Sequence, residues 1–349
     1  MNIAFDCERM KYPHTGLFEY CHQLGLALKT YSEPSDKIKY YIREGDKKHF
    51  PPESNFLTQH TLHKFIFPHY SDLNLWHITH QTSLYVPRSS RIKKVMTIHD
   101  LNFLYEEKSE WKQKNYLQKH QDNIDRADHI IAISEFTKQD IIKHLKLGDK
   151  PITVIYNGCA KEFVLPNTKP VYQPLRPFLF ALGTVNPKKN FHVLVPLLTG
   201  NDYELIIAGR TDERYKAKIM DEALKYHVAG RVKVIGTVSD TDKPWYYKNC
   251  EAFLFPSIAE GFGIPPIEAM RFGKPTFLSN ATSLPEIGGK MAYYFESDDP
   301  ENMREVFSKG MNDYSNRQPA AAIIKHAEQF TWESSAKAYL EVYNNTLNI

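Results

Sequence analysis

Residues 255–270 read FPSIAEGFGIPPIEAM, and this stretch decides the fold class. An apolar strand ends at its start, a loop with two glycines follows, and Pro265 and Pro266 can occupy the first turn of a helix. A strand, a glycine loop and a helix in this order form one turn of a parallel α/β sheet. Gly261 and Gly263 let a ligand approach the N–H groups at the helix start, where the dipole favours an anion such as a diphosphate.

Short apolar runs alternate with amphipathic stretches along the whole chain, which is typical of βα units around a parallel sheet covered on both faces. In the first half we expect strands at residues 2–6, 39–43, 75–79, 95–99, 129–133 and 153–156. In the second half we expect them at residues 178–182, 204–208, 232–235, 252–255 and 275–278. Helices are expected at residues 17–29, 111–125, 301–312 and 320–329, and from 331 towards 343. Two consecutive doubly wound sheets explain this pattern most simply.

The length of 349 residues is enough for two domains, each with a core of its own. Four prolines lie between residues 166 and 177, and because they cannot donate ladder hydrogen bonds they stiffen a chain into an extended connector. We therefore predict a Rossmann-like domain over residues 1–165, a proline-rich linker over 166–177 and a second Rossmann-like domain over 178–330.

The composition is that of an ordinary globular protein, with 42% hydrophobic residues. Its 44 Lys plus Arg and 41 Asp plus Glu leave a net charge of +3, so no strong field indicates a nucleic-acid partner. The pairs Lys47-Lys48 and Lys93-Lys94 fit solvated loops, or a mild attraction to anionic lipid headgroups.

The four cysteines are far apart and lack the spacing of a zinc site or a disulfide framework, which fits a reducing cytosol. The chain starts with an apolar strand and shows no signal-peptide pattern. No stretch approaches the roughly 20 apolar residues that a transmembrane helix needs. We therefore expect a cytoplasmic protein, with any membrane contact peripheral at the inner face of the cytoplasmic membrane.

Two carboxylates flank the glycine loop, Glu260 inside it and Glu268 one turn inside the next helix. Charged acceptors hold sugar and ribose hydroxyls well, because these hydroxyls both donate and accept hydrogen bonds. A single acid near a helix start is ordinary, since the dipole favours it. Two acids, two glycines and two prolines at this spacing favour a ligand site.

This segment resembles the E-x7-E signature of the retaining glycosyltransferases of family 4, and the resemblance covers nearly the whole chain. It implies an α/β fold of the GT-B type, with two Rossmann-like, doubly wound parallel-sheet domains that face each other across a cleft. It also implies that Glu260 lies beside the transferred sugar and that Glu268 binds the donor ribose. The amides that contact the sugar and the phosphates then belong to Gly261, Phe262, Gly263 and Ile264.

A second signal follows the first strand of the second domain, where residues 182–190 read LGTVNPKKN. Gly183 lies at a strand's carboxyl end, where doubly wound folds bind phosphates. Lys188 and Lys189 can neutralise a diphosphate as the glycosidic bond breaks, which stabilises the transition state; alone, a lysine pair is a solvated turn. The family more often has Arg at the position of Lys188, and Lys cannot make the two-pronged contact of Arg with phosphate. Lys189 is therefore the stronger candidate.

In the first domain, Gly16 opens a helix after the first strand and resembles the family's glycine loop, which reaches towards the donor phosphates; the alternative is a plain βα turn. The loop lacks G-x-G-x-x-G, which counts against dinucleotide binding. His99 ends a strand and matches the family's His-Asp pair, in which the His contacts the donor sugar. We predict Glu260, His99 and Lys189 as the catalytic residues.

Two further loops of the second domain are predicted donor contacts, Arg210 after its second strand and Val238 after its third. By resemblance, the loop of Val238 contacts the nucleotide base through its backbone. Residues 330–333 resemble the family's C-terminal segment, so we expect 331–349 to form a helix that packs back on the N-terminal domain. The resemblance makes residues 1–165 the acceptor domain and 178–330 the nucleotide-sugar donor domain.

Residues 240–242 read DTD, the carboxylate pair with which another glycosyltransferase fold holds a divalent cation. A solvated turn and helix cap explains this polar loop better. Because the two lysines supply positive charge, we expect no metal and no cofactor.

The resemblance implies a retaining, metal-independent hexosyltransferase. One alternative is a glycoside hydrolase with Glu260 and Glu268 as its acid and base, although such an enzyme has no use for a diphosphate site. Another is a non-catalytic or NAD-binding Rossmann protein. Residues 279–289 resemble bacterial mannosyltransferases, which favours GDP-mannose as the donor and leaves a UDP-hexose as the alternative. The expected acceptor is a glycan or lipid-linked glycan of surface polysaccharide synthesis, and the sequence predicts no oligomeric state.

Overall fold

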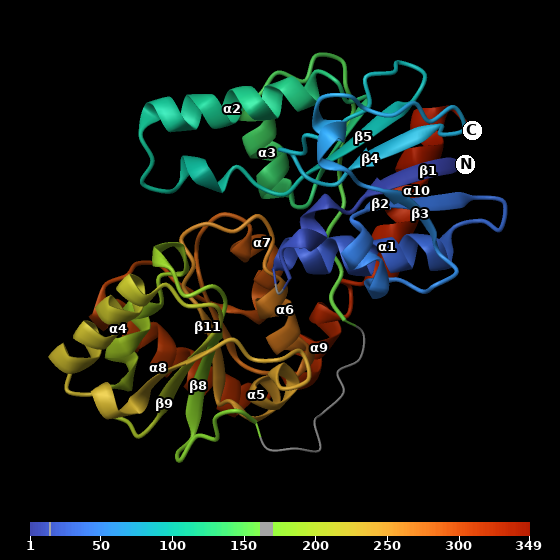
Figure 1. The fold of residues 1–349 in the computed structure, drawn as a ribbon. Helices are drawn as coiled ribbons and strands as arrows, with labels where there is room; N and C mark the ends of the chain where they lie inside the picture. Colours follow the sequence, from blue (N-terminus) through green and yellow to red (C-terminus); the bar gives the residue numbers. More distant parts are fainter. Residues whose placement is uncertain (14, 161–169) are drawn as a thin grey trace. The chain divides into compact units, whose positions relative to one another are not determined.

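The computed structural model describes residues 1–13, 15–160 and 170–349 of the chain, which forms two compact units (Figure 1). Unit 1 consists of Met1–Gly158 and Phe330–Ile349, and unit 2 consists of Cys159–Gln329. Each unit is built around its own parallel sheet. Residues 166–169 of the predicted linker lie outside the described residues, whereas 170–177 belong to unit 2.

Unit 1 contains a seven-stranded sheet in the order β3-β2-β1-β4-β5-β6-β7, with all neighbours parallel. Its strands are β1 (Asn2–Asp6), β2 (Lys37–Ile42), β3 (Asn55–Thr58), β4 (Leu75–Ile78), β5 (Lys93–Ile98), β6 (His129–Ala132) and β7 (Ile152–Val154). Its α-helices are α1 (Gly16–Tyr31), α2 (Glu110–Ile124), α3 (Glu135–His144) and α10 (Trp332–Leu347). Short 3-10 helices are η1 (Glu8–Lys11), η2 (Glu44–His49), η3 (Thr61–Lys64) and η4 (Asn102–Leu104).

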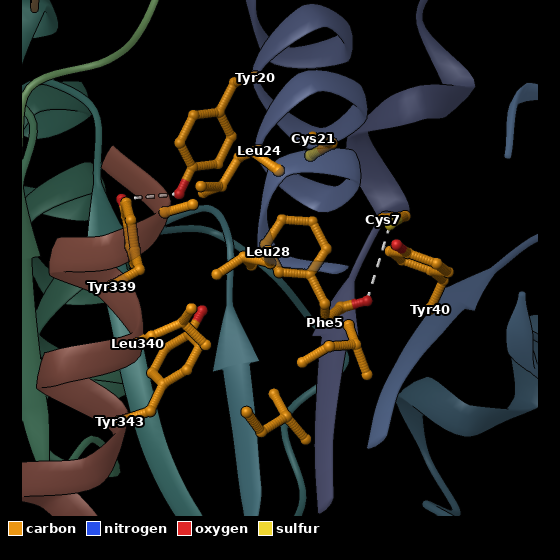
Figure 2. Close-up of a cluster of buried hydrophobic side chains, with 14 of the residues drawn as sticks. Phe5, Cys7, Tyr20, Cys21, Leu24, Leu28, Tyr40, Tyr339, Leu340 and Tyr343 are labelled. Atoms are coloured by element: carbon orange, nitrogen blue, oxygen red, sulfur yellow. Dashed lines mark hydrogen bonds between the residues drawn. The ribbon is translucent and has the colours of Figure 1, made fainter. Parts of the chain in front are cut away.

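The C-terminal helix α10 completes the core of unit 1, where it packs beside α1 (Figures 1 and 2). The hydroxyls of Tyr20 and Tyr339 lie 2.9 Å apart, and both contact the hydroxyl of Thr97 on β5. One turn further on, the hydroxyl of Tyr343 forms a 2.6 Å hydrogen bond with Nδ1 of His77 on β4. These buried hydroxyls are paired, so the large aromatic side chains can fill the core without an unsatisfied polar group.

Unit 2 contains a six-stranded parallel sheet in the order β10-β9-β8-β11-β12-β13. Its strands are β8 (Phe178–Leu182), β9 (Glu204–Ala208), β10 (Val232–Gly236), β11 (Ala252–Phe255), β12 (Thr276–Ser279) and β13 (Tyr293–Phe295). Its α-helices are α4 (Glu213–Lys225), α5 (Lys243–Asn249), α6 (Ile264–Arg271), α7 (Leu284–Gly288), α8 (Pro300–Arg317) and α9 (Ala320–Ala327). Its 3-10 helices are η5 (Pro187–Lys189), η6 (Phe191–Leu198), η7 (Ala229–Arg231) and η8 (Gly289–Met291).

The segment before β8 is fastened to unit 2 by side-chain hydrogen bonds. The hydroxyl of Tyr172 donates to Glu204 at 2.8 Å, and the N–H of Leu175 donates to the same carboxylate at 3.2 Å. The hydroxyl of Tyr246 donates to the carbonyl of Tyr172 at 2.8 Å. The described part of the proline-rich stretch therefore lies against the sheet that it precedes.

The predicted fold class is confirmed: both halves are doubly wound parallel sheets. The ends of all eleven predicted strands lie within two residues of the observed ends. The prediction missed β3 and β13, which are four and three residues long and form sheet edges. Among the described residues, no helix combines the length and the apolar character that crossing a bilayer requires.

Candidate functional site

The loops after β8 and β11 meet at the centre of the unit 2 sheet. These strands are neighbours, and the chain continues outwards from β8 through β9 and β10 on one side and from β11 through β12 and β13 on the other. In open α/β sheets, ligands bind outside the carboxyl ends of the strands at such a reversal of strand order. Both sequence signals of the second domain lie at this point, Lys188-Lys189 after β8 and Glu260 after β11.

Lys189 and Glu260 form an ion pair across the two loops. Each side chain is 13% exposed, so the pair lies at the edge of the interior. The ammonium of Lys189 also lies 4.6 Å from the centre of the Phe255 ring, in cation–π contact at the end of β11. The hydroxyl of Ser257 donates to Oε1 of Glu260, the oxygen that Lys189 contacts, while Oε2 has no hydrogen-bond partner among the described residues.

The charge of Glu260 is stabilised by its surroundings. Burial alone raises the pKa of this carboxyl, but Lys189, Lys188 and the hydrogen bond from Ser257 together outweigh burial and lower the pKa below 4.5. Glu260 is therefore ionised at neutral pH and can only accept hydrogen bonds. A carboxylate of this kind suits the binding of a hydroxyl and not the donation of a proton.

The loop after β8 positions both lysines through its own capping contacts. The side chain of Asn186 accepts from the N–H of Lys189 at 3.2 Å and caps η5, with Pro187 in its first turn. The carbonyl of Lys188 accepts from the N–H of Ile258 at 3.0 Å, which joins this loop to the loop after β11. The predicted lysine site and the predicted glutamate site are thus one structural unit.

Gly183 and Gly209 allow the turns after β8 and β9 to pass very close to each other. Gly209 has a φ of 140°, and a Cβ at this position would lie 2.0 Å from the carbonyl oxygen of Gly183. Gly183 has a φ of 154°, and a Cβ there would lie 3.1 Å from Cε of Lys189. The course of the chain beneath the lysines therefore requires glycine at position 209 and leaves little room at position 183.

Hydroxyl side chains that the sequence analysis did not select fix the backbone of the glutamate loop. The hydroxyl of Thr282 accepts from the N–H of Glu260 at 2.9 Å. The hydroxyl of Ser283 donates to the carbonyls of Glu260 and Phe262, at 2.9 and 2.7 Å. Because Thr282 and Ser283 follow β12, the neighbour of β11, the serine and threonine residues after a predicted central strand were the signal that could have found them.

The helix α6 begins as the sequence predicted, directly after Gly263, whose φ is 136°. The first N–H groups of a helix have no acceptor within it, and Pro265 and Pro266 have no N–H. The N–H groups of Gly263 and Ile264 therefore remain for a ligand at this helix end, beside the positive end of the dipole. Gly261 and Phe262 precede them in a buried stretch of the same loop.

Glu268 lies on α6 and is 8% exposed. Its Oε2 accepts from the hydroxyl of Tyr247 on α5 at 2.7 Å, and its Oε1 lies 3.5 Å from the ammonium of Lys243. Burial, together with the charge of Glu268, raises the pKa of Tyr247 well above its usual value, so the phenol stays protonated as a donor. Tyr247 and Lys243 were also absent from the sequence prediction.

The other predicted donor contacts of unit 2 lie in neighbouring loops. The side chain of Arg210 is exposed, and its carbonyl accepts from the N–H of Val185 at 2.8 Å. Val238 is 6% exposed and packs in the hydrophobic cluster that includes Tyr246 and Tyr247. Its side chain is part of the core, which leaves its backbone for any contact with a base.

His99 and Gly16 belong to unit 1. The ring Nε2 of His99 lies 2.8 Å from the carbonyl of Thr79, and burial lowers the pKa of His99 to about 4. Since a carbonyl can only accept, Nε2 carries the proton and Nδ1 is left as an acceptor in the neutral ring. Gly16 is the first residue of α1, capped by the hydroxyl of Thr15, and a Cβ at Gly16 would meet no atom within 4 Å.

The DTD segment forms a polar turn before α5. Asp240 pairs with Lys243 at 2.9 Å, and the hydroxyl of Ser239 accepts from the N–H of Asp242 at 3.0 Å. Asp242 stands at the N-cap position, but its side chain makes no cap hydrogen bond, so that detail of the expected cap is wrong. The described part of the chain contains no group of three or more His, Cys, Asp or Glu that could hold a metal ion.

Two family models match the chain in succession. Residues 30–163 match the model described as Glycosyltransferase Family 4, and residues 170–330 match the model described as Glycosyl transferases group 1. The first of these matches lies largely within unit 1, and the second covers all of unit 2 beyond residue 169.

Several curated bacterial proteins are similar in sequence. The serotype-specific mannosyltransferase WbdA of Escherichia coli is 27% identical over 274 residues, which are 73% of this chain and 34% of that protein. The chain thus spans about a third of WbdA. The O-antigen chain mannosyltransferase B of Escherichia coli is 25% identical over 386 aligned positions, which cover 98% of this chain and 99% of that protein.

Solved structures share the fold over the whole chain. The sucrose-phosphate synthase of Thermosynechococcus elongatus has a TM-score of 0.77 at 17% identity and covers 99% of this chain and 98% of its own. Anabaena HepE, solved with UDP and glucose, has a TM-score of 0.69 at 17% identity, with 99% of this chain and 100% of its own covered. With both family models matched in order and relatives that align along its full length, the chain belongs to glycosyltransferase family 4 and has the GT-B fold.

Proposed function

We propose that this glycosyltransferase is a retaining, metal-independent hexosyltransferase that acts in surface polysaccharide synthesis. The observation that carries the proposal is the ion pair of Lys189 and Glu260 at the point where the strand order of unit 2 reverses. It combines a charge suited to phosphate and a carboxylate suited to hydroxyls in two loops that are joined by the backbone hydrogen bond from Ile258 to Lys188.

In this proposal the donor diphosphate binds the N–H groups of Gly263 and Ile264 and the ammonium groups of Lys188 and Lys189. The helix dipole and the lysines both favour a dianionic group, so no cation is needed to bind it. Glu260 accepts from hydroxyls of the transferred hexose through Oε2, the oxygen that neither Lys189 nor Ser257 contacts. Glu268 accepts from the ribose hydroxyls.

The chemical step exchanges two bonds at the anomeric carbon. The bond from C1 to the diphosphate oxygen breaks, and a bond from C1 to the acceptor oxygen forms on the same face. The proton of the acceptor hydroxyl passes to the departing phosphate oxygen, so the nucleoside diphosphate leaves with the charge balanced. The lysines stabilise the negative charge that develops on that oxygen, which lowers the barrier more than it tightens the ground state.

GDP-mannose is the proposed donor. It is supported by the relatives, because WbdA and the O-antigen chain mannosyltransferases of Escherichia coli and Salmonella typhimurium are named for mannosyl transfer. The acceptor is then a glycan or lipid-linked glycan. A UDP-hexose is the alternative, supported by HepE structures that are titled as complexes with UDP and with UDP-glucose.

A donor screen followed by product analysis tests the proposal. Thermal shift with GDP-mannose, UDP-glucose, UDP-galactose and UDP-N-acetylglucosamine should show one stabilising donor, because a ligand that binds only the folded state raises its melting temperature. Calorimetry in the presence of a chelator should give the same affinity for that donor. NMR of the glycoside product should show the anomeric configuration of the donor. An inverted product, or donor binding that requires a metal, contradicts the proposal.

A further inference from the structure

One stretch of unit 1 is unusually poor in acids and rich in cations. Residues 59–99 contain one acid, Asp72, and five Lys or Arg residues, although acids and cations are nearly equal in number over the whole chain. Asp72 pairs with Lys39 and Lys93 pairs with Asp128, so one acid and one cation of the stretch each have a partner outside it. The stretch therefore gives unit 1 a local positive charge that the net charge of +3 conceals.

The long connection between β3 and β4 displays apolar side chains in this stretch. After β3 ends at Thr58, sixteen residues pass before β4 begins at Leu75, which is long for a connection in a compact domain and typical of loops with a function. The 3-10 helix η3 and the residues after it expose three large apolar side chains. Leu62 is 72% exposed, Phe65 is 70% exposed and Ile66 is 80% exposed.

The connection is firmly packed beneath these exposed residues. The hydroxyl of Tyr41 lies 2.8 Å from Nδ1 of His63, and the ring of Phe67 packs edge-on against Trp76 at 5.1 Å. Tyr70 stacks on Trp76 at 6.3 Å. The loop thus anchors itself through one set of rings while it turns Leu62, Phe65 and Ile66 outwards, so their exposure does not arise from a lack of packing partners nearby.

A second segment brings cations to the same surface. An open groove of about 260 Å³ is lined by residues 65–70 of the connection and by residues 87–89 and 92 of the segment before β5. Arg88 lines this groove, Arg91 is exposed three positions further along the chain, and the ammonium of Lys64 lies 5.7 Å from the centre of the Tyr85 ring. Within the part of the chain that the structure describes, no ion pair joins Lys64, Arg88 or Arg91 to an acid.

We propose that Leu62, Lys64, Phe65, Ile66, Arg88 and Arg91, here the basic-apolar patch, dock unit 1 on an anionic lipid bilayer. Exposed apolar side chains rimmed by cations match the two parts of such a surface, since the apolar groups enter the headgroup boundary and the cations meet lipid phosphates. A protein partner would have to cover three apolar side chains and offer acids to three cations. An anionic bilayer provides an apolar layer and negative charge, and it needs no fixed shape to match the patch. The charge complementarity between anionic lipids and this acid-poor stretch therefore favours the bilayer.

Vesicle binding by the full chain tests this surface. Vesicles of roughly one part phosphatidylglycerol to two parts phosphatidylcholine should bind the protein, whereas pure phosphatidylcholine should bind it at least about tenfold more weakly. Binding should weaken as salt rises, because salt screens exposed charges. The double variant Phe65→Ser and Ile66→Ser and the double variant Arg88→Gln and Arg91→Gln should each lower the partition coefficient at least about tenfold.

The matched control replaces an exposed apolar residue and an exposed cation on unit 2. Leu224 is 63% exposed on α4 of unit 2, and Lys225 beside it is 64% exposed, so Leu224→Ser with Lys225→Gln should leave vesicle binding unchanged. Urea unfolding followed by circular dichroism should have the same midpoint for all these variants, which shows that they fold without reference to donor binding and separates this test from that of the proposed reaction. The inference is wrong if the wild type ignores anionic vesicles, if the control loses as much as the patch variants, or if light scattering shows the patch to be a dimer contact.

Discussion

The ammonium of Lys189 contacts the same oxygen of Glu260 that accepts from the hydroxyl of Ser257, and the other carboxylate oxygen has no hydrogen-bond partner among the described residues. The two residues of this ion pair therefore have different roles. Lys189 keeps Glu260 ionised and in place, and Glu260 holds the ammonium at the mouth of a loop where a diphosphate is proposed to bind. Each residue therefore depends on the other, which makes their effects on the reaction coupled.

Lys189→Gln should lower kcat more than it weakens donor binding. The variant removes the positive charge that we propose stabilises the departing diphosphate, and it leaves Glu260 without its counter-charge. Loss of one charge-assisted contact costs roughly 1.5 to 3 kcal/mol, which is about a ten- to a hundredfold change in rate. Initial rates across donor concentrations give kcat and KM, and calorimetry gives the donor affinity.

The double variant of Lys189→Gln with Glu260→Gln tests the coupling. The fold loss of kcat in the double variant should be smaller than the product of the fold losses in the two single variants. The reason is that the second substitution removes a side chain that has already lost its ion-pair partner. Lys225→Gln, which removes an exposed lysine paired with Glu222, serves as the control and should leave both constants unchanged. Additive losses would mean that the two side chains act independently.

Glu268→Gln should weaken donor binding about tenfold or more with little change in kcat, since it removes the charge that we propose accepts from the ribose hydroxyls. Tyr247→Phe is the informative companion. It removes the 2.7 Å hydrogen bond to Oε2 but leaves the carboxylate charged, so its effect on donor affinity should be smaller. Isothermal calorimetry with the nucleoside diphosphate alone and with the sugar nucleotide separates ribose binding from sugar binding. Unaltered affinity in Glu268→Gln would exclude this carboxylate from the donor site.

Gly209→Ala should destabilise unit 2 by about 1 to 3 kcal/mol, because the new Cβ would lie 2.0 Å from the carbonyl oxygen of Gly183 at a φ that side chains rarely adopt. Gly230→Ala is the matched control, since a Cβ there meets no atom within 4 Å. Urea unfolding monitored by circular dichroism compares the two. If both variants unfold at the same urea concentration, the close approach of the two turns is not a constraint.

Asp6→Asn should change how stability depends on pH. Burial raises the pKa of Asp6 from 3.8 to about 7, with hydrogen bonds from Ser83 and from the N–H of Glu8 opposing the rise. The folded state thus binds this proton more tightly than the unfolded state, and the stability that it contributes is complete below about pH 4 and is lost as the pH rises through about 7. Asparagine carries no charge at any of these pH values.

Relative to the wild type, Asp6→Asn should therefore gain about 1 to 4 kcal/mol of unfolding free energy between about pH 5 and about pH 8. Urea unfolding at several pH values measures the difference. A difference between the two proteins that is constant over this range would show that Asp6 is ionised in the folded protein throughout.

The sequence predicted the parts of the molecule that follow from local patterns. The alternation of apolar runs located eleven of the thirteen strands, and the residues from Phe255 to Met270 predicted the strand, loop and helix as they are found. The edge strands β3 and β13 escaped because NFLT and YYF lack the run of β-branched residues that marks β7, an edge strand of similar length. The boundary between the two domains was predicted from the proline content of residues 166–177, whereas the observed units are defined by packing around two cores.

The sequence predicted those residues of the candidate site that combine a suitable side chain with a position at the end of a predicted strand. Glycines, lysines and acids at strand ends were found because their types indicate phosphate and hydroxyl binding. The supporting contacts were not, since Thr282 and Ser283 act through hydrogen bonds to the backbone of another loop, and Tyr247 reaches Glu268 from a different helix. Such partners are specified by the three-dimensional register of neighbouring elements, which no single-sequence pattern records.

The hydroxyl contact between Tyr20 and Tyr339 joins residues 319 positions apart and has a consequence for synthesis of the protein. Unit 2 is one continuous segment of the chain, so the ribosome synthesises all of it without interruption. Unit 1 is not, because its first 158 residues are synthesised long before α10, the helix that completes their core. During that interval the nascent N-terminal segment keeps an uncovered apolar face beside α1, and this face stays exposed until α10 has been synthesised. Unit 2 is thus expected to fold on the ribosome before the core of unit 1 is complete.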